Sequence, residues 1–366
     1  MNLHIVPDNT FINAFYDNLA ELDLLKANKV VVRTNHKQLV SIKREIPFAP
    51  LYSRQFERIV GDTIRYEKVF IHYFTPLLYK WIARHHFKEL NWMVWGGDLY
   101  NLPGLDHLCY EPLTLRRYVE RDWSPATLLY KLKVQLLHAS HKADAYRKVK
   151  NILTWMREEY KFALDNLPVK AAHKFFFYEN QFPYAALDRF RNPAQTEGRV
   201  KLIIGNSGSP ANNHMDVVEF LNDQGIEADL VIPASYGDKR YIRFLKKNLI
   251  FKHGNLEFIE QYMPFESYVE MISGADALVM NTVRPQGYGN ILMMMYLNKP
   301  VYFNQKNSSL SELTEAGIEF RDIKALGDLR KGTEIDNQDR VTALLSHDRL
   351  LETYKALFSD FTDSSR

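Results

Sequence analysis

The chain has 366 residues, 46% of them hydrophobic and 25% charged, and its formal net charge is +3 at pH 7. This length is sufficient for two domains with separate cores, and the charge is too mild to indicate nucleic-acid binding. Cys109 is the only cysteine, which excludes an intrachain disulfide and a cysteine-based zinc site and fits a reducing cytosol. The first residues do not resemble a secretory signal and no apolar run could span a bilayer, so we expect a soluble or peripheral protein.

The first half of the chain is predicted to alternate strands and helices. Its expected strands cover residues 3–6, 30–33, 39–42, 67–72, 90–95, 152–155 and 175–178. Apolar residues recur at helical spacing from Ile12 to Leu22, so a helix follows the first strand. Residues 101–150 lack strand alternation and are expected to be helical and surface-facing. Residues 179–199 contain prolines and mixed charge typical of a connection, so we expect domains over 1–197 and 198–366.

Two side chains at the ends of first-half strands are candidates for catalysis. Asp98 follows Gly96-Gly97 at the end of an aromatic strand, where carboxylates often bind substrate hydroxyls or act as general bases. Capping of the next short helix is the structural alternative for this Asp. His72 ends the preceding strand, and for this residue alone a hydrogen-bonded core histidine is the stronger interpretation.

A basic stretch runs from Arg116 to Lys150. It contains nine Lys or Arg against three acids, mixed with leucines and aromatic residues. Such a helical face is suited to anionic lipid headgroups, with about 1 kcal/mol from each well-placed cation. A solvated helix face explains the same pattern equally well.

The second half shows a clearer alternation of strands and helices. Its six expected strands cover residues 201–204, 229–232, 255–260, 276–280, 300–303 and 317–320. This alternation predicts a parallel sheet with right-handed crossovers. In the common strand order 3-2-1-4-5-6, the first and fourth strands are neighbours and ligands bind beside their carboxyl ends.

Two glycine loops follow these two strands. The first contains Gly205, Asn206, Ser207 and Gly208, and the second contains Gly287, Tyr288, Gly289 and Asn290. Glycines let a backbone approach a ligand closely, and the helix start that follows attracts an anion such as a diphosphate. One such loop could merely turn the chain, but two at neighbouring strand ends favour a phosphate site. No metal ligands are expected in it.

Further candidates for nucleotide contacts follow the second, third and fourth strands of this half. Tyr236, Tyr262 and Met263 could contact a base, ribose or phosphate, although core packing explains them nearly as well. Arg284 could add a cation near the diphosphate or face solvent. The first loop does not match G-x-G-x-x-G, and the chain lacks a P-loop, a G-x-S-x-G elbow and an H-E-x-x-H helix. An NAD-linked oxidoreductase is therefore a distant alternative.

Four segments carry a resemblance to a known family. Residues 95–100 read W-G-G-D-L-Y, 204–208 read I-G-N-S-G, 213–214 read N-H and 286–290 read Q-G-Y-G-N. They resemble the bacterial transferases of TDP-4-acetamido-4,6-dideoxygalactose (Fuc4NAc), which extend the lipid-linked disaccharide of enterobacterial common antigen.

The resemblance covers most of the chain from Glu67 to about Phe320. It implies a GT-B architecture of two Rossmann-like doubly wound domains facing a cleft, with a TDP-sugar in the second domain and no cofactor. It also implies a polyprenyl-diphosphate-linked acceptor and peripheral attachment to the cytoplasmic face of the inner membrane. Two alternatives stay open, a GT-B enzyme that uses another nucleotide sugar for capsule or lipopolysaccharide and a non-catalytic nucleotide-binding protein.

Overall fold

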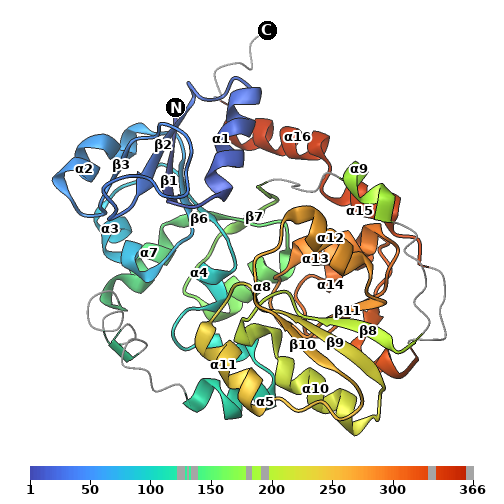
Figure 1. Ribbon diagram of the computed structural model, residues 1–366. Helices are drawn as coiled ribbons and strands as arrows, with labels where there is room; N and C mark the ends of the chain where they lie inside the picture. Colours follow the sequence, from blue (N-terminus) through green and yellow to red (C-terminus); the bar gives the residue numbers. More distant parts are fainter. Residues whose placement is uncertain are drawn as a thin grey trace. The chain divides into compact units, whose positions relative to one another are not determined.

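A computed structural model of the chain (Figure 1) describes residues 1–121, 128–129, 132, 139–178, 184–190, 198–328 and 335–359. These residues form two compact units. Counting only their described residues, the first unit takes Met1–Pro103, Pro125–Asn180 and Leu345–Arg366, and the second takes Gly104–Ser124 and Gln181–Leu344. Each unit is a parallel sheet whose strands alternate with helices, which confirms the expected pair of Rossmann-like domains.

The first unit contains a seven-stranded sheet in the order β3-β2-β1-β4-β5-β6-β7. Its strands are β1 (Asn2–Pro7), β2 (Asn28–Arg33), β3 (Phe48–Ala49), β4 (Val69–His72), β5 (Leu90–Met93), β6 (Val149–Leu153) and β7 (Ala172–Lys174). Its helices are α1 (Phe11–Glu21), α2 (Arg54–Val60), η1 (Thr63–Arg65), η2 (Pro76–Leu78), α3 (Tyr79–Arg84), α4 (Gly97–Tyr100), η5 (Ala139–His141), α7 (Lys142–Arg147), α8 (Arg157–Asn166) and α16 (His347–Phe358). The central strands are almost wholly buried, as expected for a parallel sheet covered on both faces.

Two of the expected first-half strands are wrong. Residues 39–42 form no strand, because the backbone N–H groups of residues 40–42 donate to the Asp8 carboxylate. The strand lies instead at β3, where Pro47 and Pro50 predicted only a turn. Prolines are tolerated there because β3 is the edge strand and pairs with β2 alone. The last expected strand, over 175–178, lies just beyond β7.

The second unit confirms the predicted strand order. Its six-stranded sheet runs β10-β9-β8-β11-β12-β13, which is 3-2-1-4-5-6 in chain order. The strands are β8 (Val200–Ile204), β9 (Ala228–Pro233), β10 (Leu256–Ile259), β11 (Ala277–Met280), β12 (Val301–Phe303) and β13 (Arg321–Asp322). The helices are η3 (Asp106–Cys109), α5 (Pro112–Arg117), η4 (Val119–Arg121), α9 (Tyr184–Leu187), η6 (Asp188–Phe190), η7 (Pro210–Asn212), α10 (His214–Asp223), α11 (Lys239–Asn248), α12 (Phe265–Ser273), α13 (Tyr288–Tyr296), α14 (Leu310–Glu315), η8 (Ile323–Asp328) and α15 (Gln338–Leu344). The sixth strand begins later than the predicted 317–320.

The domain boundary differs from the predicted split at residue 197, first because the described residues 104–121 belong to the second unit. The Asp216 carboxylate accepts hydrogen bonds from the backbone N–H groups of Leu113 and Thr114 and from the Thr114 hydroxyl, at 2.8, 3.0 and 2.6 Å. This carboxylate therefore caps the first turn of α5. Side-chain capping of this kind cannot be read from hydrophobic periodicity, so the sequence placed the segment in the wrong unit.

The boundary differs a second time at the C-terminus, because α16 belongs to the first unit and not to the second. The Phe358 ring packs within 5.1 Å of the rings of His4 and Phe70, measured between centroids. The Phe358 carbonyl accepts hydrogen bonds from the side-chain amides of Asn2 and Asn28. These contacts place the end of α16 against β1, β2 and β4 of the first sheet.

Two predictions lie partly outside the described residues. The expected connection over 179–199 is described only at 184–190 and from 198 onward, and the basic stretch over 116–150 is not described at 122–127, 130–131 and 133–138. Within the described part of the chain, every helix is too short or too polar to cross a membrane.

Candidate functional site

The carboxyl ends of β8 and β11 lie side by side in the second sheet. Leu278 pairs with Ile203 and Val279 with Ile204, and the Gly205 N–H continues the ladder by donating to the Val279 carbonyl at 2.8 Å. The loops that leave these two strands therefore start at the same edge. This is the topological switch point, where ligands bind in sheets of this order.

The first loop wraps around the side chain of Asn212. Gly205 has φ +70°, and a Cβ placed there would lie 2.7 Å from the Asn212 side chain. The Asn212 amide donates to the Ser207 carbonyl at 2.8 Å, and its oxygen accepts from the Asn206 N–H at 3.3 Å. Only glycine combines this backbone conformation with so close an approach. Gly208 is also restricted in space, because a Cβ placed there would lie 2.4 Å from the Ile242 side chain.

The second loop lies directly against the first. Gly287 has φ +70° at the start of α13, and a Cβ placed there would lie 2.7 Å from the Asn206 Cβ. The Gln286 amide donates to the side-chain oxygens of Asn206 and Asn212, at 3.2 and 2.9 Å. Gly289, predicted to precede the helix, lies in its first turn beside Tyr288, the first helical residue. The loops therefore form one continuous cradle.

Asn290 is the buried polar group of this cradle with unused donor capacity. Its side chain is 8% exposed, and its oxygen accepts from the Tyr268 hydroxyl at 2.9 Å. Its Nδ2 group has no partner among the described residues. An unpaired buried amide costs about 1–3 kcal/mol, and the start of the nine-residue helix α13 beside it adds partial positive charge. Both features suit an anionic ligand.

The remaining donor-binding candidates differ in exposure. The Tyr236 hydroxyl accepts from the Asn206 amide at 2.8 Å, while 60% of Tyr236 stays exposed. Tyr262, in the loop after β10, is 88% exposed, and Met263 beside it is half-buried. The Arg284 Nε donates to the Gln286 oxygen at 2.9 Å, so this guanidinium is oriented by the second loop.

Sequence reasoning missed a layer of asparagines beneath the cradle. The Asn213 amide donates to the Asn281 carbonyl at 2.8 Å, and the Asn304 amide donates to the Asn281 side chain at 2.8 Å. The same Asn304 amide reaches Glu111 at 2.9 Å. The sequence did single out Asn213, because the pair Asn213-His214 is one of the four segments that resemble the known family. Asn281 and Asn304 each come one residue after a strand, but isolated asparagines there predict only turns.

In the first unit, Asp98 lies in the first turn of α4 and is 2% exposed. Its carboxylate accepts from the backbone N–H groups of Phe74 and Trp95, at 2.8 and 2.9 Å, and from the Trp92 indole at 2.6 Å. Burial raises the pKa of Asp98, and these hydrogen bonds oppose the rise. Both oxygens are engaged, so these surroundings favour an orienting role for the loop over direct proton transfer.

His72 lies in a buried chain of hydrogen bonds. The Asn28 amide donates to two carbonyls, so its oxygen must accept from His4 Nε2, at 3.0 Å. His4 Nδ1 then accepts from His72 Nε2 at 3.1 Å, and His72 Nδ1 accepts from the Tyr178 hydroxyl at 2.6 Å. Burial lowers the pKa of His4 to about 3 and the pKa of His72 well below its usual value. A core role fits this arrangement, and the catalytic assignments of His72 and Asp98 stay predictions.

Arg33, at the end of β2, is a further group that sequence reasoning missed. Its Nη2 donates to the Tyr73 carbonyl at 2.9 Å, and its buried Nε has no partner among the described residues. Burial lowers the pKa of Arg33 to about 10, while Tyr73 and Asp98 oppose that shift. This edge of the first sheet therefore carries a cation with a vacant donor position. A single Arg at a strand end gives no such signal in the sequence.

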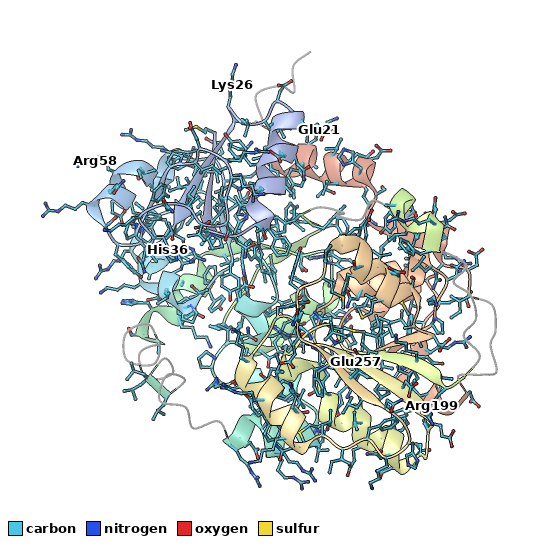
Figure 2. The ribbon with its side chains drawn as sticks, viewed as in Figure 1. Glu21, Lys26, His36, Arg58, Arg199 and Glu257 are labelled. Atoms are coloured by element: carbon cyan, nitrogen blue, oxygen red, sulfur yellow. The ribbon has the colours of Figure 1, made fainter. Side chains whose placement is uncertain are left out.

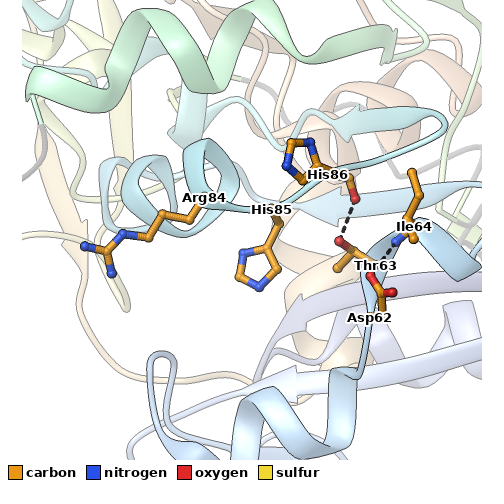
Figure 3. A pocket seen from close by; sticks show the side chains of 6 residues that line it. All are labelled: Asp62, Thr63, Ile64, Arg84, His85 and His86. Atoms are coloured by element: carbon orange, nitrogen blue, oxygen red, sulfur yellow. Dashed lines mark hydrogen bonds between the residues drawn. The ribbon is translucent and has the colours of Figure 1, made fainter.

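A hollow of about 520 Å³ lies elsewhere in the first unit (Figure 3). It is lined by Asp62, Thr63, Ile64, Arg84, His85 and His86. These residues precede β4 and β5, so the hollow is at the amino ends of the strands. The expected active-site residues lie at the carboxyl ends, and the hollow is separate from them.

Comparison with known proteins gives the family and the fold. A family model described as 4-alpha-L-fucosyltransferase, glycosyl transferase group 56, matches residues 127–343. The sucrose-phosphate synthase of Thermosynechococcus elongatus is 10% identical, with a TM-score of 0.57 and 98% of each chain covered. Anabaena HepE in complex with UDP-glucose is 11% identical, with a TM-score of 0.57, 97% of this chain and all of that one covered. The lipopolysaccharide outer core galactosyltransferase WaaB is 10% identical, with a TM-score of 0.50 and coverage of 99% and 96%. These likenesses identify the fold as GT-B.

Proposed function

Because the chain belongs to the 4-alpha-L-fucosyltransferase family, glycosyl transferase group 56, we propose that it transfers a Fuc4NAc-like sugar from a TDP-sugar. The proposed acceptor is a polyprenyl-diphosphate-linked oligosaccharide at the cytoplasmic face of the inner membrane. That the protein is a glycosyltransferase follows from the family and the fold. The observation that supports a diphosphate-containing donor is the contact between the Asn206 and Gly287 loops beside the Asn290 amide, whose Nδ2 has no partner among the described residues.

The proposed chemistry depends on stabilising the leaving diphosphate. Negative charge grows on the diphosphate as its bond to the sugar breaks. Backbone N–H groups in the first turn of α13, together with the Asn290 amide, are fixed in place before the reaction and suit this charge. The Arg284 guanidinium, oriented by Gln286, would add a full positive charge.

The rest of the donor would extend along the same sheet edge. Tyr236 and Tyr262 follow β9 and β10, which lie on the side of β8 away from β11, with β9 between β8 and β10. Their exposed rings offer stacking surfaces for a base or a ribose. The half-buried Met263 would add an apolar contact through its thioether. In the first unit we assign Asp98 the role of an orienting group that fixes the loop after β5.

The test is a donor screen combined with a variant of Asn290. TDP should raise the melting temperature more than UDP or GDP, and mass spectrometry should detect the extended lipid-linked product. Asn290→Ala should weaken nucleotide binding about tenfold or more, because it removes a charge-assisted hydrogen bond. Tyr268→Phe is the matched control, because it removes the hydroxyl that donates a hydrogen bond to the Asn290 oxygen and leaves the Asn290 amide in place.

Three outcomes would contradict the proposal. Stabilisation by UDP or GDP instead of TDP would favour a GT-B enzyme with another nucleotide sugar. Nucleotide binding without any transfer would favour a non-catalytic protein. Equal nucleotide affinities for Asn290→Ala and the wild type would remove Asn290 from the donor site.

A further inference from the structure

Helix α11 presents a face of like charges to solvent. Tyr241, Ile242 and Leu245 point inward and are buried. The exposed cations of the helix are Lys239, Arg240, Arg243, Lys246 and Lys247. No acidic residue lies within the helix itself.

Helix α5 and η4 extend this basic surface. Tyr118 packs against Tyr241 and Phe244 of α11, with ring centroids 4.7 and 5.0 Å apart, and its hydroxyl donates to Asp238 at 3.0 Å. Because Tyr118 lies between α5 and η4, three more exposed cations are brought to the same region of the second unit: Arg116, Arg117 and Arg121. Figure 1 shows α5 beside α11.

The charge of this surface is only partly compensated. Among the described residues, Arg240 pairs with Asp238 at 3.5 Å and Lys246 with Glu260 at 2.5 Å. Further acids adjoin α5 and η4: Asp216, whose carboxylate caps α5, and the exposed Glu120. Lys239, Arg243 and Lys247 follow one another at four-residue spacing and so form one row along the helix. Like charges at this spacing destabilise a helix by about 0.2–0.5 kcal/mol per pair. An anion bound beside the row would be attracted to all three cations and would offset the repulsion between them.

We propose that the row Lys239, Arg243 and Lys247, with the arginines of α5 and η4, is a docking surface for anionic phospholipid headgroups. The proposal rests on the proposed function, since a lipid-linked acceptor must be reached at a membrane. Ile250, 70% exposed just beyond α11, supplies an aliphatic side chain that can enter the headgroup region. The aromatic residues of α11 are buried or half-buried, whereas single-stranded nucleic acid needs exposed rings for stacking.

The experiment compares two triple variants of the full chain in vesicle flotation, with no donor or acceptor added. Lys239→Ala/Arg243→Ala/Lys247→Ala removes the row. Lys26→Ala/Arg54→Ala/Arg58→Ala removes three exposed cations of the first unit and changes the net charge equally; Lys26 and Arg58 extend into solvent in Figure 2. Vesicles of mixed phosphatidylglycerol and phosphatidylcholine are compared with pure phosphatidylcholine, at low and high salt.

The row variant should lose about two orders of magnitude in partition coefficient on the anionic vesicles, and the control variant should bind like the wild type. Wild-type binding should weaken at high salt and on pure phosphatidylcholine. Equal losses in both variants, equal binding to neutral vesicles, or loss of single-stranded RNA binding without loss of vesicle binding would overturn the proposal. Nucleotide binding by the row variant should be intact, so failure here is distinguishable from failure of the donor site.

Discussion

The contact between Gly287 and Asn206 holds the two loops of the cradle together. A Cβ at Gly287 would meet the Cβ and Cγ of Asn206 at 2.7 and 2.8 Å, and the Met280 side chain at 3.0 Å. The two nearest atoms belong to the short Asn206 side chain and lie close to its backbone, so they cannot move aside as the end of a long side chain could. The position therefore tolerates glycine alone, for reasons of both space and backbone conformation.

Gly287→Ala should consequently weaken nucleotide binding by tenfold or more and destabilise the fold by about 1–3 kcal/mol. Gly225→Ala is the matched control, because Gly225 also has positive φ, at +63°, but a Cβ there meets nothing within 4 Å. Gly225→Ala should lower the free energy of unfolding through backbone strain and leave nucleotide affinity unchanged. Calorimetric titration with TDP checks both variants, and equal affinities would contradict the role of the contact.

Asp98 illustrates how one residue can be conspicuous in sequence for a structural reason. Its carboxylate joins the ends of β4 and β5 by accepting from Phe74 and Trp95. Asp98→Asn places an amide N–H group opposite other N–H donors. We expect the free energy of unfolding to fall by about 2–4 kcal/mol.

Urea denaturation measures the effect of Asp98→Asn, with Asp62→Asn as control. Asp62 is an exposed cap that accepts from the Ile64 N–H at 3.3 Å and lies 3.9 Å from the exposed Arg65 guanidinium, so its replacement should cost much less. Unchanged stability together with abolished transfer in Asp98→Asn would instead identify a catalytic carboxylate.

At the scale of elements, α16 closes the first unit. Leu350, Tyr354 and Phe358 form its buried face, and the Tyr354 hydroxyl donates to the Tyr178 carbonyl at 3.0 Å. Lys68 on the strand side donates to the Leu357 carbonyl at 2.9 Å. The helix thus stabilises a sheet that begins more than 340 residues earlier in the chain.

Phe358→Ala should cost about 3–5 kcal/mol and act on the first unit. Hydrogen exchange should accelerate at the amides of β1 and β4 while those of β8 and β11 keep their protection. Lys355→Ala, on the exposed side of the same helix, should change neither. Faster exchange at β8 and β11 would place α16 with the second unit, as its position in the sequence suggested.

The second sheet was predictable because its strands are continuous apolar runs separated by helices, and β8 through β12 appear close to their expected bounds. The cradle followed from that order, since neighbouring strands bring the Gly205 and Gly287 loops together. The docking of α5 on Asp216 and of α16 on Phe70 could not be predicted, because both depend on contacts between residues far apart in the chain. Local periodicity carries no information about such partners.

At the scale of the whole molecule, three buried neutral histidines make stability depend on pH. Burial lowers the pKa of His4 and His214 to about 3 and that of His72 well below its usual value. As the pH falls below about 6.5, the unfolded chain binds protons that the folded chain does not, so the free energy of unfolding decreases. The loss should approach about 4 kcal/mol per pH unit for three such groups, and continue toward the folded pKa values. The raised pKa of Asp98 opposes this trend at the acidic end.

Urea midpoints between about pH 7.5 and pH 5 check this dependence. His214→Leu should reduce the slope by about one third, because it removes one titrating group at a position whose Nε2 has no partner among the described residues. A midpoint that does not change over this range would show that the histidines titrate normally.

The central claim is that the two glycine loops of the second unit hold a nucleoside diphosphate. A crystal structure of the protein with TDP tests it most directly. We predict diphosphate density at the start of α13, with a phosphate oxygen about 3 Å from Asn290 Nδ2 and in contact with the Gly205 loop. Diphosphate density in the hollow lined by Arg84 and His86, or beside Arg33 in the first unit, would contradict it.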